Sequence, residues 1–187
     1  MGKLSEYIVS DHCRYYGAAG NTLFKSIIHA IMPGGYRGFK YGFWLRVSQH
    51  RGLFQPLGII MHHHLSIKYC IDMPRVTRIG YGLYLGHGMC MVVNGRTVIG
   101  NNVNLSQFLN IGANSVDEFA TIGDNVYVAP HCSIVGRVSL GDNVTIGTGS
   151  VVTRDIASGM TAVGAPAHEV TSKNPGRYIN NRYEPKG

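Results

Sequence analysis

Residues 122–152 read IGDNVYVAPHCSIVGRVSLGDNVTIGTGSVV and carry an aliphatic residue at every sixth position. These positions are Ile122, Val128, Ile134, Leu140, Ile146 and Val152. A period of six is typical of a parallel β-helix, in which three short faces complete one coil and each face turns one aliphatic side chain inward. Each such side chain contributes about 1.5–3 kcal/mol when stacked coils cover it. The stretch therefore predicts a solenoid of stacked coils.

The same period begins upstream and is interrupted twice. Its earlier members are Ile79, Leu85, Met91, Ile99, Leu105 and Ile111. A slip of two residues falls at Asn94-Gly95, and a slip of five falls within Ala113–Ala120. Gly-Asn-Asn and Gly-Asp-Asn units follow several repeat residues and fit corners with positive φ. A helix would need apolar residues three and four positions apart. An ordinary antiparallel β domain, the alternative, does not account for a phase kept this long.

Two further segments flank the repeat, which we place at residues 71–153. Residues 1–70 predict a basic segment with short helices over 3–16, 21–31, 36–50 and 55–69, and Asn21 as an N-cap. Residues 154–187 predict a loop and a polar tail that return along the coils. The predicted fold class is thus mainly β, a parallel β-helix behind a short α-helical N-terminal segment.

The formal net charge is +7, and residues 1–70 hold +6 of it. Such an excess suits a membrane surface, an anionic glycan or nucleic acid, or an ordinary solvated surface. Because no basic sheet with base-stacking aromatics is evident, we predict no nucleic-acid partner. Residues 37–51 mix basic and aromatic side chains, which suits an interfacial helix or a helix that caps the base of the prism. We favour capping, with membrane contact as the alternative.

The four cysteines, Cys13, Cys70, Cys90 and Cys132, show no paired spacing, which indicates a reducing compartment. Cys132 falls at an inward position and is expected to be a small core residue. The sequence shows no signal peptide and no stretch of membrane-spanning length. We therefore predict a cytoplasmic location, with a peripheral contact to the membrane as the alternative.

Residues three hexads apart stack above one another, so the repeat also identifies columns. One predicted corner column contains His87, Gln107, Pro130 and Thr148. The column beside it contains Gly86, Ser106, Ala129 and Gly147, all of them small. A polar residue at the base of one column, beside a column of small residues, suits a long thin ligand that approaches backbone N–H groups closely.

His87 is the candidate general base, because Gly86 and Gly88 leave its imidazole open. An imidazole can take a proton from a hydroxyl at physiological pH. Asp72 lies fifteen residues earlier, close to one coil of eighteen residues, and its carboxylate could fix the tautomer of that imidazole. The alternative is a purely structural histidine. The run His62–His64 points in three directions along a helix, so we predict no metal site.

Several motifs resemble those of serine acetyltransferases. Ile71-Asp72-Met73-Pro74, followed by Ile79-Gly80, is similar to their Asp-Ile-His-Pro…Ile-Gly segment. Gly86-His87-Gly88, followed by Val92-Val93, is similar to their Asp-His-(Ala/Gly)…Gly-Val-Val segment. Three more motifs match at Gln107-Phe108-Leu109-Asn110-Ile111-Gly112, Gly147-Thr148-Gly149-Ser150-Val151-Val152 and Gly164-Ala165-Pro166-Ala167. Over residues 71–170 the chain thus resembles the hexapeptide-repeat acetyltransferases, which include related capsule and exopolysaccharide O-acetyltransferases.

The resemblance implies a left-handed β-helix that forms a homotrimer, with acetyl-CoA as co-substrate in the groove between subunits. It implies that His87, supported by Asp72, deprotonates an acceptor hydroxyl, and that the backbone at Gly112 and Ala113 receives the oxyanion. The residues that it implies for CoA binding are Gln107, Ala129, Pro130, Gly147, Thr148, Ala165 and Pro166.

Three departures from the family concern the acceptor. Gly86 replaces an acidic residue before the catalytic histidine, and residues 114–119 lack the Arg-His pair that binds the amino acid. The large acidic N-terminal domain is replaced by a short basic one. We therefore favour an acetyl-CoA-dependent O-acetyltransferase that acts on a hydroxyl of a sugar or polysaccharide. The alternatives are a serine O-acetyltransferase of cysteine biosynthesis and a non-catalytic β-helix scaffold.

Overall fold

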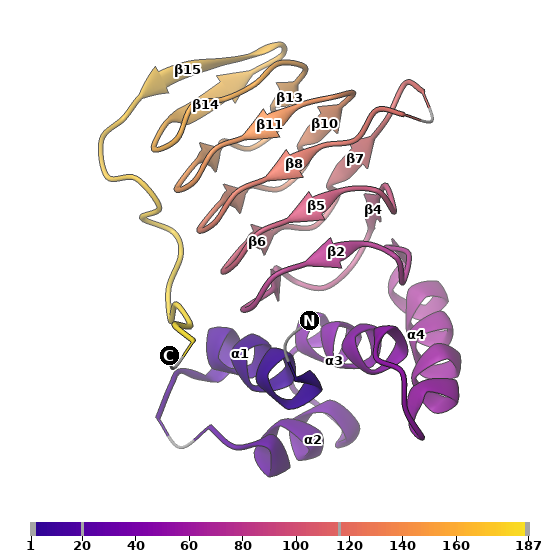
Figure 1. The fold of residues 1–187 in the computed structure, drawn as a ribbon. Coiled ribbons are helices and arrows are strands. Elements are labelled where there is room, and N and C mark those ends of the chain that lie inside the picture. Colours follow the sequence, from indigo (N-terminus) through magenta and orange to yellow (C-terminus); the bar gives the residue numbers. More distant parts are fainter. Residues whose placement is uncertain (1–2, 20, 116, 186–187) are drawn as a thin grey trace.

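The computed structural model describes residues 3–19, 21–115 and 117–185. Four helices precede a tall stack of strands (Figure 1). They are α1 (Leu4–Tyr16), α2 (Leu23–Ile31), α3 (Arg37–Gln49) and α4 (Gln55–Tyr69). Each helix begins and ends within two residues of its predicted range. The N-cap of α2 is Thr22, whose hydroxyl accepts from Lys25 N, and not Asn21, whose side chain bonds His12 instead.

The strands form three faces of a prism. The first face contains β1 (Ile71–Asp72), β4 (Met91–Val93), β7 (Asn110–Gly112), β10 (Ser133–Val135) and β13 (Val151–Val152). The second contains β2 (Arg78–Ile79), β5 (Val98–Ile99), β8 (Thr121–Ile122) and β11 (Ser139–Leu140). The third contains β3 (Tyr84–Leu85), β6 (Asn104–Leu105), β9 (Tyr127–Val128), β12 (Thr145–Ile146), β14 (Thr161–Gly164) and β15 (Ala167–Thr171). All pairs are parallel except β14 with β15, which confirms the predicted parallel β-helix.

The predicted repeat residues form the core of the prism. Leu105, Val128, Ile134 and Ile146 are completely buried, and Cys132 is buried as expected. The two-residue slip, however, does not lie at Asn94-Gly95. Leu85 pairs with Leu105 and Val93 with Ile111, so the two extra residues lie between Leu85 and Val93. The placement was ambiguous because Met91 and Val93 both point inward from the same strand.

The corners are built by side chains that reach from one coil to the next. Asn101 Oδ1 accepts from Tyr81 N (2.9 Å), Asp124 Oδ1 from Asn101 N (2.7 Å) and Asp142 Oδ1 from Asp124 N (2.7 Å). The positive φ values belong to the last residue of each unit, Asn102, Asn125 and Asn143. The predicted positive φ therefore occurs within these units, at the asparagine and not at the glycine. The glycines are needed because the next coil comes too close for a side chain.

Gly100→Ala tests this account of the corners. A Cβ at Gly100 would lie 2.6 Å from the carbonyl oxygen of Gly123, so one coil must shift. We expect the free energy of unfolding in urea to fall by about 1–3 kcal/mol. Gly52→Ala is the control, because a Cβ there meets no atom within 4 Å. Equal effects of the two substitutions would contradict the steric explanation.

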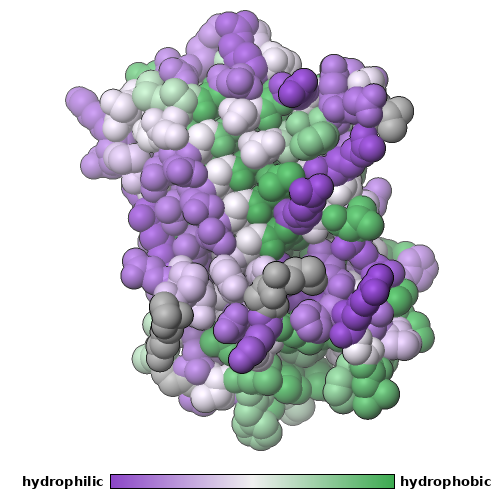
Figure 2. Space-filling model, viewed as in Figure 1, coloured by the Kyte–Doolittle hydropathy of each residue, from purple (hydrophilic) through white to green (hydrophobic). Residues whose placement is uncertain are grey.

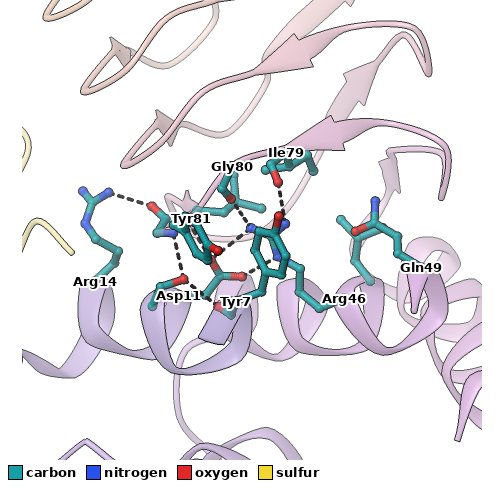
Figure 3. Close-up of polar contacts among 12 residues, drawn as sticks. Tyr7, Asp11, Arg14, Arg46, Gln49, Ile79, Gly80 and Tyr81 are labelled. Atoms are coloured by element: carbon teal, nitrogen blue, oxygen red, sulfur yellow. Dashed lines mark hydrogen bonds and ion pairs between the residues drawn. The ribbon is translucent and has the colours of Figure 1, made fainter. Parts of the chain in front are cut away.

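Two helices close the lower end of the prism (Figure 3). Arg46 of α3 donates to Ile79 O (2.8 Å) and Gly80 O (2.6 Å) of the first coil. It also forms a two-pronged ion pair with Asp11 of α1, with N–O distances of 2.9 and 3.1 Å. Asp11 Oδ1 in turn accepts from Leu83 N (2.7 Å). Most of α3 is buried, so it caps the prism, which is the role we favoured for residues 37–51.

The C-terminal segment returns along the coils, as predicted (Figure 1). Tyr183 exchanges two hydrogen bonds with the side chain of Asn102, and Arg14 Nε donates to Asn180 O (2.9 Å). Before that return, however, the segment is not a loop. β14 extends the third face by pairing with β12, and β15 folds back against β14.

Candidate functional site

His87 lies at an exposed corner between β3 and β4. This corner carries the two extra residues of the repeat, so it protrudes relative to the corners above it. His87, Gly88 and Cys90 all have positive φ, between 51° and 57°. The imidazole is exposed to solvent, as the flanking glycines predicted.

The N-terminal helices hold this corner in place. A Cβ on Gly88 would lie 2.6 Å from the Cα of Gly38, in the first turn of α3. On the other side, Cys90 N donates to Tyr69 O (2.9 Å) at the end of α4. The hydroxyl of Tyr15 on α1 accepts from Leu85 N (2.7 Å). Three helices thus fix the backbone on both sides of His87.

Asp72 lies on β1, exposed, and pairs with Val92 of β4. Asp72 is therefore one coil below β4, the strand that follows His87. This agrees with the interval of fifteen residues between Asp72 and His87. Among the described residues, no hydrogen bond joins the carboxylate of Asp72 to His87. The support of His87 by Asp72 remains a prediction.

Sequence reasoning missed a buried polar pair near Asp72. A hydrogen bond of 2.9 Å joins Tyr41 Oη to His62 Nε2, and Tyr41 Oη also donates to Met73 O (3.4 Å). Burial raises the pKa of Tyr41 to about 12 and lowers the pKa of His62, and the charge of Asp72 acts on both groups. The signal was the spacing of Gly58, His62 and Leu65, which is that of one helix face.

The corner column exists, but its foot differs from the prediction. Phe108 N donates to Cys90 O (2.7 Å), His131 N to Gln107 O (3.2 Å) and Gly149 N to Pro130 O (3.0 Å). These bonds stack Cys90, Gln107, Pro130 and Thr148. The two extra residues between Leu85 and Val93 lengthen this corner relative to the next coil. His87 lies in the lengthened part, before Cys90, and is therefore beside the column and not at its base. The rings of Phe108 and His131 stack next to it, with centroids 4.5 Å apart.

The column of small residues is also present, but its N–H groups are occupied. Gly86 N, Ser106 N, Ala129 N and Gly147 N each donate to a carbonyl of the next coil. The expected free donors are therefore not in this column. Within the described part of the chain, no backbone hydrogen bond uses the N–H of Gln107 or Thr148. Gln107 Oε1 is buried there without a partner, so some polar groups along the corner column are not used by hydrogen bonds within the chain.

The remaining predicted residues lie in two places. Thr148 is two residues beyond Ile146, which pairs with Ala162, so Ala165-Pro166 continues the same corner above it. Gly112 instead ends β7 and Ala113 follows it, whereas Gln107 precedes this strand. They lie at the opposite edge of the first face. The single chain does not bring the predicted oxyanion site to the His87 corner. The adjoining loop contains Val116, which lies outside the described residues.

Known proteins share this architecture and part of this sequence. The family model for bacterial transferase hexapeptide (six repeats) matches residues 119–154. A serine acetyltransferase of Staphylococcus epidermidis is 36% identical over 117 residues, which cover 61% of this chain and 54% of the relative. Mitochondrial serine acetyltransferase 3 of Arabidopsis thaliana is 31% identical over 121 residues, covering 63% of this chain and 31% of the relative. The chain thus spans about half or less of these relatives.

Solved structures agree with this similarity. Soybean serine acetyltransferase without ligand superimposes with a TM-score of 0.73 at 28% identity, covering 89% of this chain and 69% of the soybean chain. The same enzyme complexed with serine gives 0.72 at 29% identity with the same coverage. The chain is a hexapeptide-repeat β-helix protein. It resembles the serine acetyltransferases, as its motifs predicted.

Proposed function

We propose that this protein is an acetyl-CoA-dependent O-acetyltransferase. The observation that carries the proposal is the exposed His87, held by three helices beside a column with unused polar groups. Similarity to serine acetyltransferases supports the same chemistry. In this reaction His87 takes the proton of an acceptor hydroxyl while the oxygen attacks the thioester carbonyl. Collapse of the tetrahedral intermediate breaks the C–S bond, and the thiolate of CoA receives the proton from His87.

Other residues would assist in this scheme. Asp72 would fix the orientation of the His87 ring, and an N–H near Gly112 and Ala113 would stabilise the oxyanion. The arm of CoA would lie along Gln107, Ala129, Pro130, Gly147 and Thr148, and then along Ala165 and Pro166. A carboxylate that reaches the ring only after the substrate binds is compatible with this scheme, because catalytic hydrogen bonds often tighten in the substrate complex.

We further propose a homotrimer. The two parts of the proposed site lie at opposite edges of one face, with β4 and β7 between them. If copies of this face meet around a threefold axis, the His87 edge of one subunit can approach the Gly112 edge of its neighbour. A complete site would then form only between subunits. The predicted membrane contact of residues 1–70 is independent of this reaction.

Two acceptor classes remain. The names of the relatives favour L-serine, and one soybean structure is a complex with serine. The absence of an Arg-His pair from residues 114–119 favours a sugar hydroxyl. Thiol release from acetyl-CoA, measured in parallel with L-serine and with nucleotide sugars, distinguishes the two. No turnover with either, together with no binding of acetyl-CoA by calorimetry, would support the scaffold reading and refute the enzyme.

Thr148→Phe tests the proposed CoA path. Thr148 is exposed on the corner column, and a phenyl ring there would block the wall along which the CoA arm should pass. We expect the affinity for acetyl-CoA to fall about tenfold or more. Thr153→Phe, at an exposed position beyond β13, serves as the control in the same calorimetric titration. Unchanged affinity in Thr148→Phe would place CoA elsewhere.

A further inference from the structure

Helix α2 is turned with its apolar side outward. The residues that it buries against the protein are Ser26 and Ala30. Its large apolar residues, Leu23, Phe24, Ile27, Ile28 and Ile31, are exposed, with Phe24 at 71% and Ile31 at 62%. An amphipathic helix of a soluble domain normally turns such a stripe toward the core. The apolar stripe of α2 is therefore available for contact with a partner outside the chain.

Helix α4 repeats this arrangement. It packs on α3 through Gly58, His62 and Leu65, and so closely that a Cβ on Gly58 would lie 2.8 Å from the backbone of Val47. Its apolar residues Ile60 and Ile67 are 64% and 68% exposed. Leu53 and Phe54, just before the helix, are also exposed. Two separate helices thus present their larger side chains to the outside.

These side chains gather at one end of the molecule. Figure 2 shows apolar surface at the lower end, where Figure 1 places α2 and α4, opposite β15. We define the apolar helical face by Phe24, Ile27, Ile31, Phe54, Ile60 and Ile67. Exposed clusters of large apolar side chains on a protein surface mark contacts with proteins or membranes.

Charge distinguishes between these partners. From His12 to Ile71 the sequence contains no aspartate or glutamate. In the same stretch Lys25, Arg37, Arg51 and Lys68 are exposed, whereas Arg14 and Arg46 are buried at the base of the prism. A second copy docked on this face would bring these cations together without a carboxylate between them. An anionic surface would instead complement them.

We propose that the apolar helical face docks onto an anionic lipid bilayer. Helices with large apolar residues on one side and lysine or arginine around them lie in the membrane interface with the apolar side immersed. Each lysine or arginine near such a surface adds electrostatic attraction. Among the described residues, no helix has the length and hydropathy of a membrane span. This site differs from residues 37–51, where the sequence alone put the membrane alternative, because α3 is buried.

Flotation of the full chain with lipid vesicles tests the proposal. We expect the protein to float with vesicles of mixed phosphatidylcholine and phosphatidylglycerol, and far less with phosphatidylcholine alone. Phe24→Gln combined with Ile31→Gln should lower the vesicle affinity by at least about tenfold, since two exposed apolar groups are lost. The matched control is Val76→Gln with Val170→Gln, two exposed valines of the β-helix region, which should bind as the unmodified protein does.

The outcomes separate the possible occupants of the face. Lys25→Gln with Lys68→Gln should weaken the preference for phosphatidylglycerol, although Arg37 and Arg51 remain, and raised salt should weaken binding. No flotation with either vesicle overturns the proposal. Flotation that stays intact in Phe24→Gln with Ile31→Gln also overturns the proposal. So does a result in which the protein binds no vesicles and the variant merely has a smaller oligomer size in sedimentation. Acetyl transfer is measured separately, so failure of the lipid test leaves the proposed reaction untouched.

Discussion

His87→Asn is expected to lower kcat for acetyl transfer by about 10²–10⁴-fold, because the hydroxyl would lose its general base. Asparagine is chosen because His87 has φ of 57°, a conformation that asparagine adopts readily while most residues do not. The corner should therefore keep its shape. The affinity for acetyl-CoA, measured by calorimetry, is expected to change little, since CoA would lie along the column beside His87.

His168→Asn provides the comparison for this result. His168 is exposed on β15, outside the proposed catalytic corner. Its substitution should leave kcat unchanged in the same thiol-release assay. If His87→Asn retains full turnover, another group removes the proton, and the proposed role of His87 is wrong.

Asp11→Asn is expected to lower the free energy of unfolding by about 3–5 kcal/mol. The side chains of Asp11 and Arg46 are 2% and 3% exposed, so the substitution leaves a buried guanidinium without its counter-charge. The same carboxylate accepts Leu83 N, which ties α1 to the first coils. Urea unfolding followed by circular dichroism measures the change.

Asp117→Asn is the matched control for Asp11→Asn. Asp117 also pairs with an arginine, Arg96, at 3.2 Å, but its side chain is 97% exposed. Exposed pairs contribute about 0–1 kcal/mol, so this variant should unfold almost as the unmodified protein does. Similar losses in both variants would show that burial does not decide the strength of the Asp11–Arg46 pair.

The sequence predicted the regular part of the fold because regular structure requires apolar residues at regular intervals. Six-residue spacing identified the coils, and spacings of three and four placed the helices. Irregular features were harder to predict. The two extra residues were misplaced because Met91 and Val93 are equally suitable inward residues. The outward orientation of the apolar side of α2 could not be predicted from its sequence. Apolar residues at helical spacing predict a helix, but they do not show what its apolar side contacts.

The candidate site shows the same division. The columns followed from stacking, and Gln107, Pro130 and Thr148 do lie above one another. Their relation to His87 depended on the misplaced insertion, so the predicted foot of the column was wrong. The Tyr41–His62 pair was missed because it joins two helices. The spacing within α4 indicates that His62 faces the protein, but not which side chain of α3 it contacts. The separation of Gly112 from His87 likewise becomes visible only when the faces are closed into a prism.

The contact between Gly88 and the first turn of α3 has a consequence for protein engineering. Solenoids are commonly treated as modules that can be lengthened or exchanged repeat by repeat. Here the corner that carries His87 packs against α3 and is hydrogen-bonded to the end of α4. A chimera that joins this β-helix to foreign helices would keep its coils but lose the support of that corner. The exchangeable module of this protein is therefore the coils together with their helices.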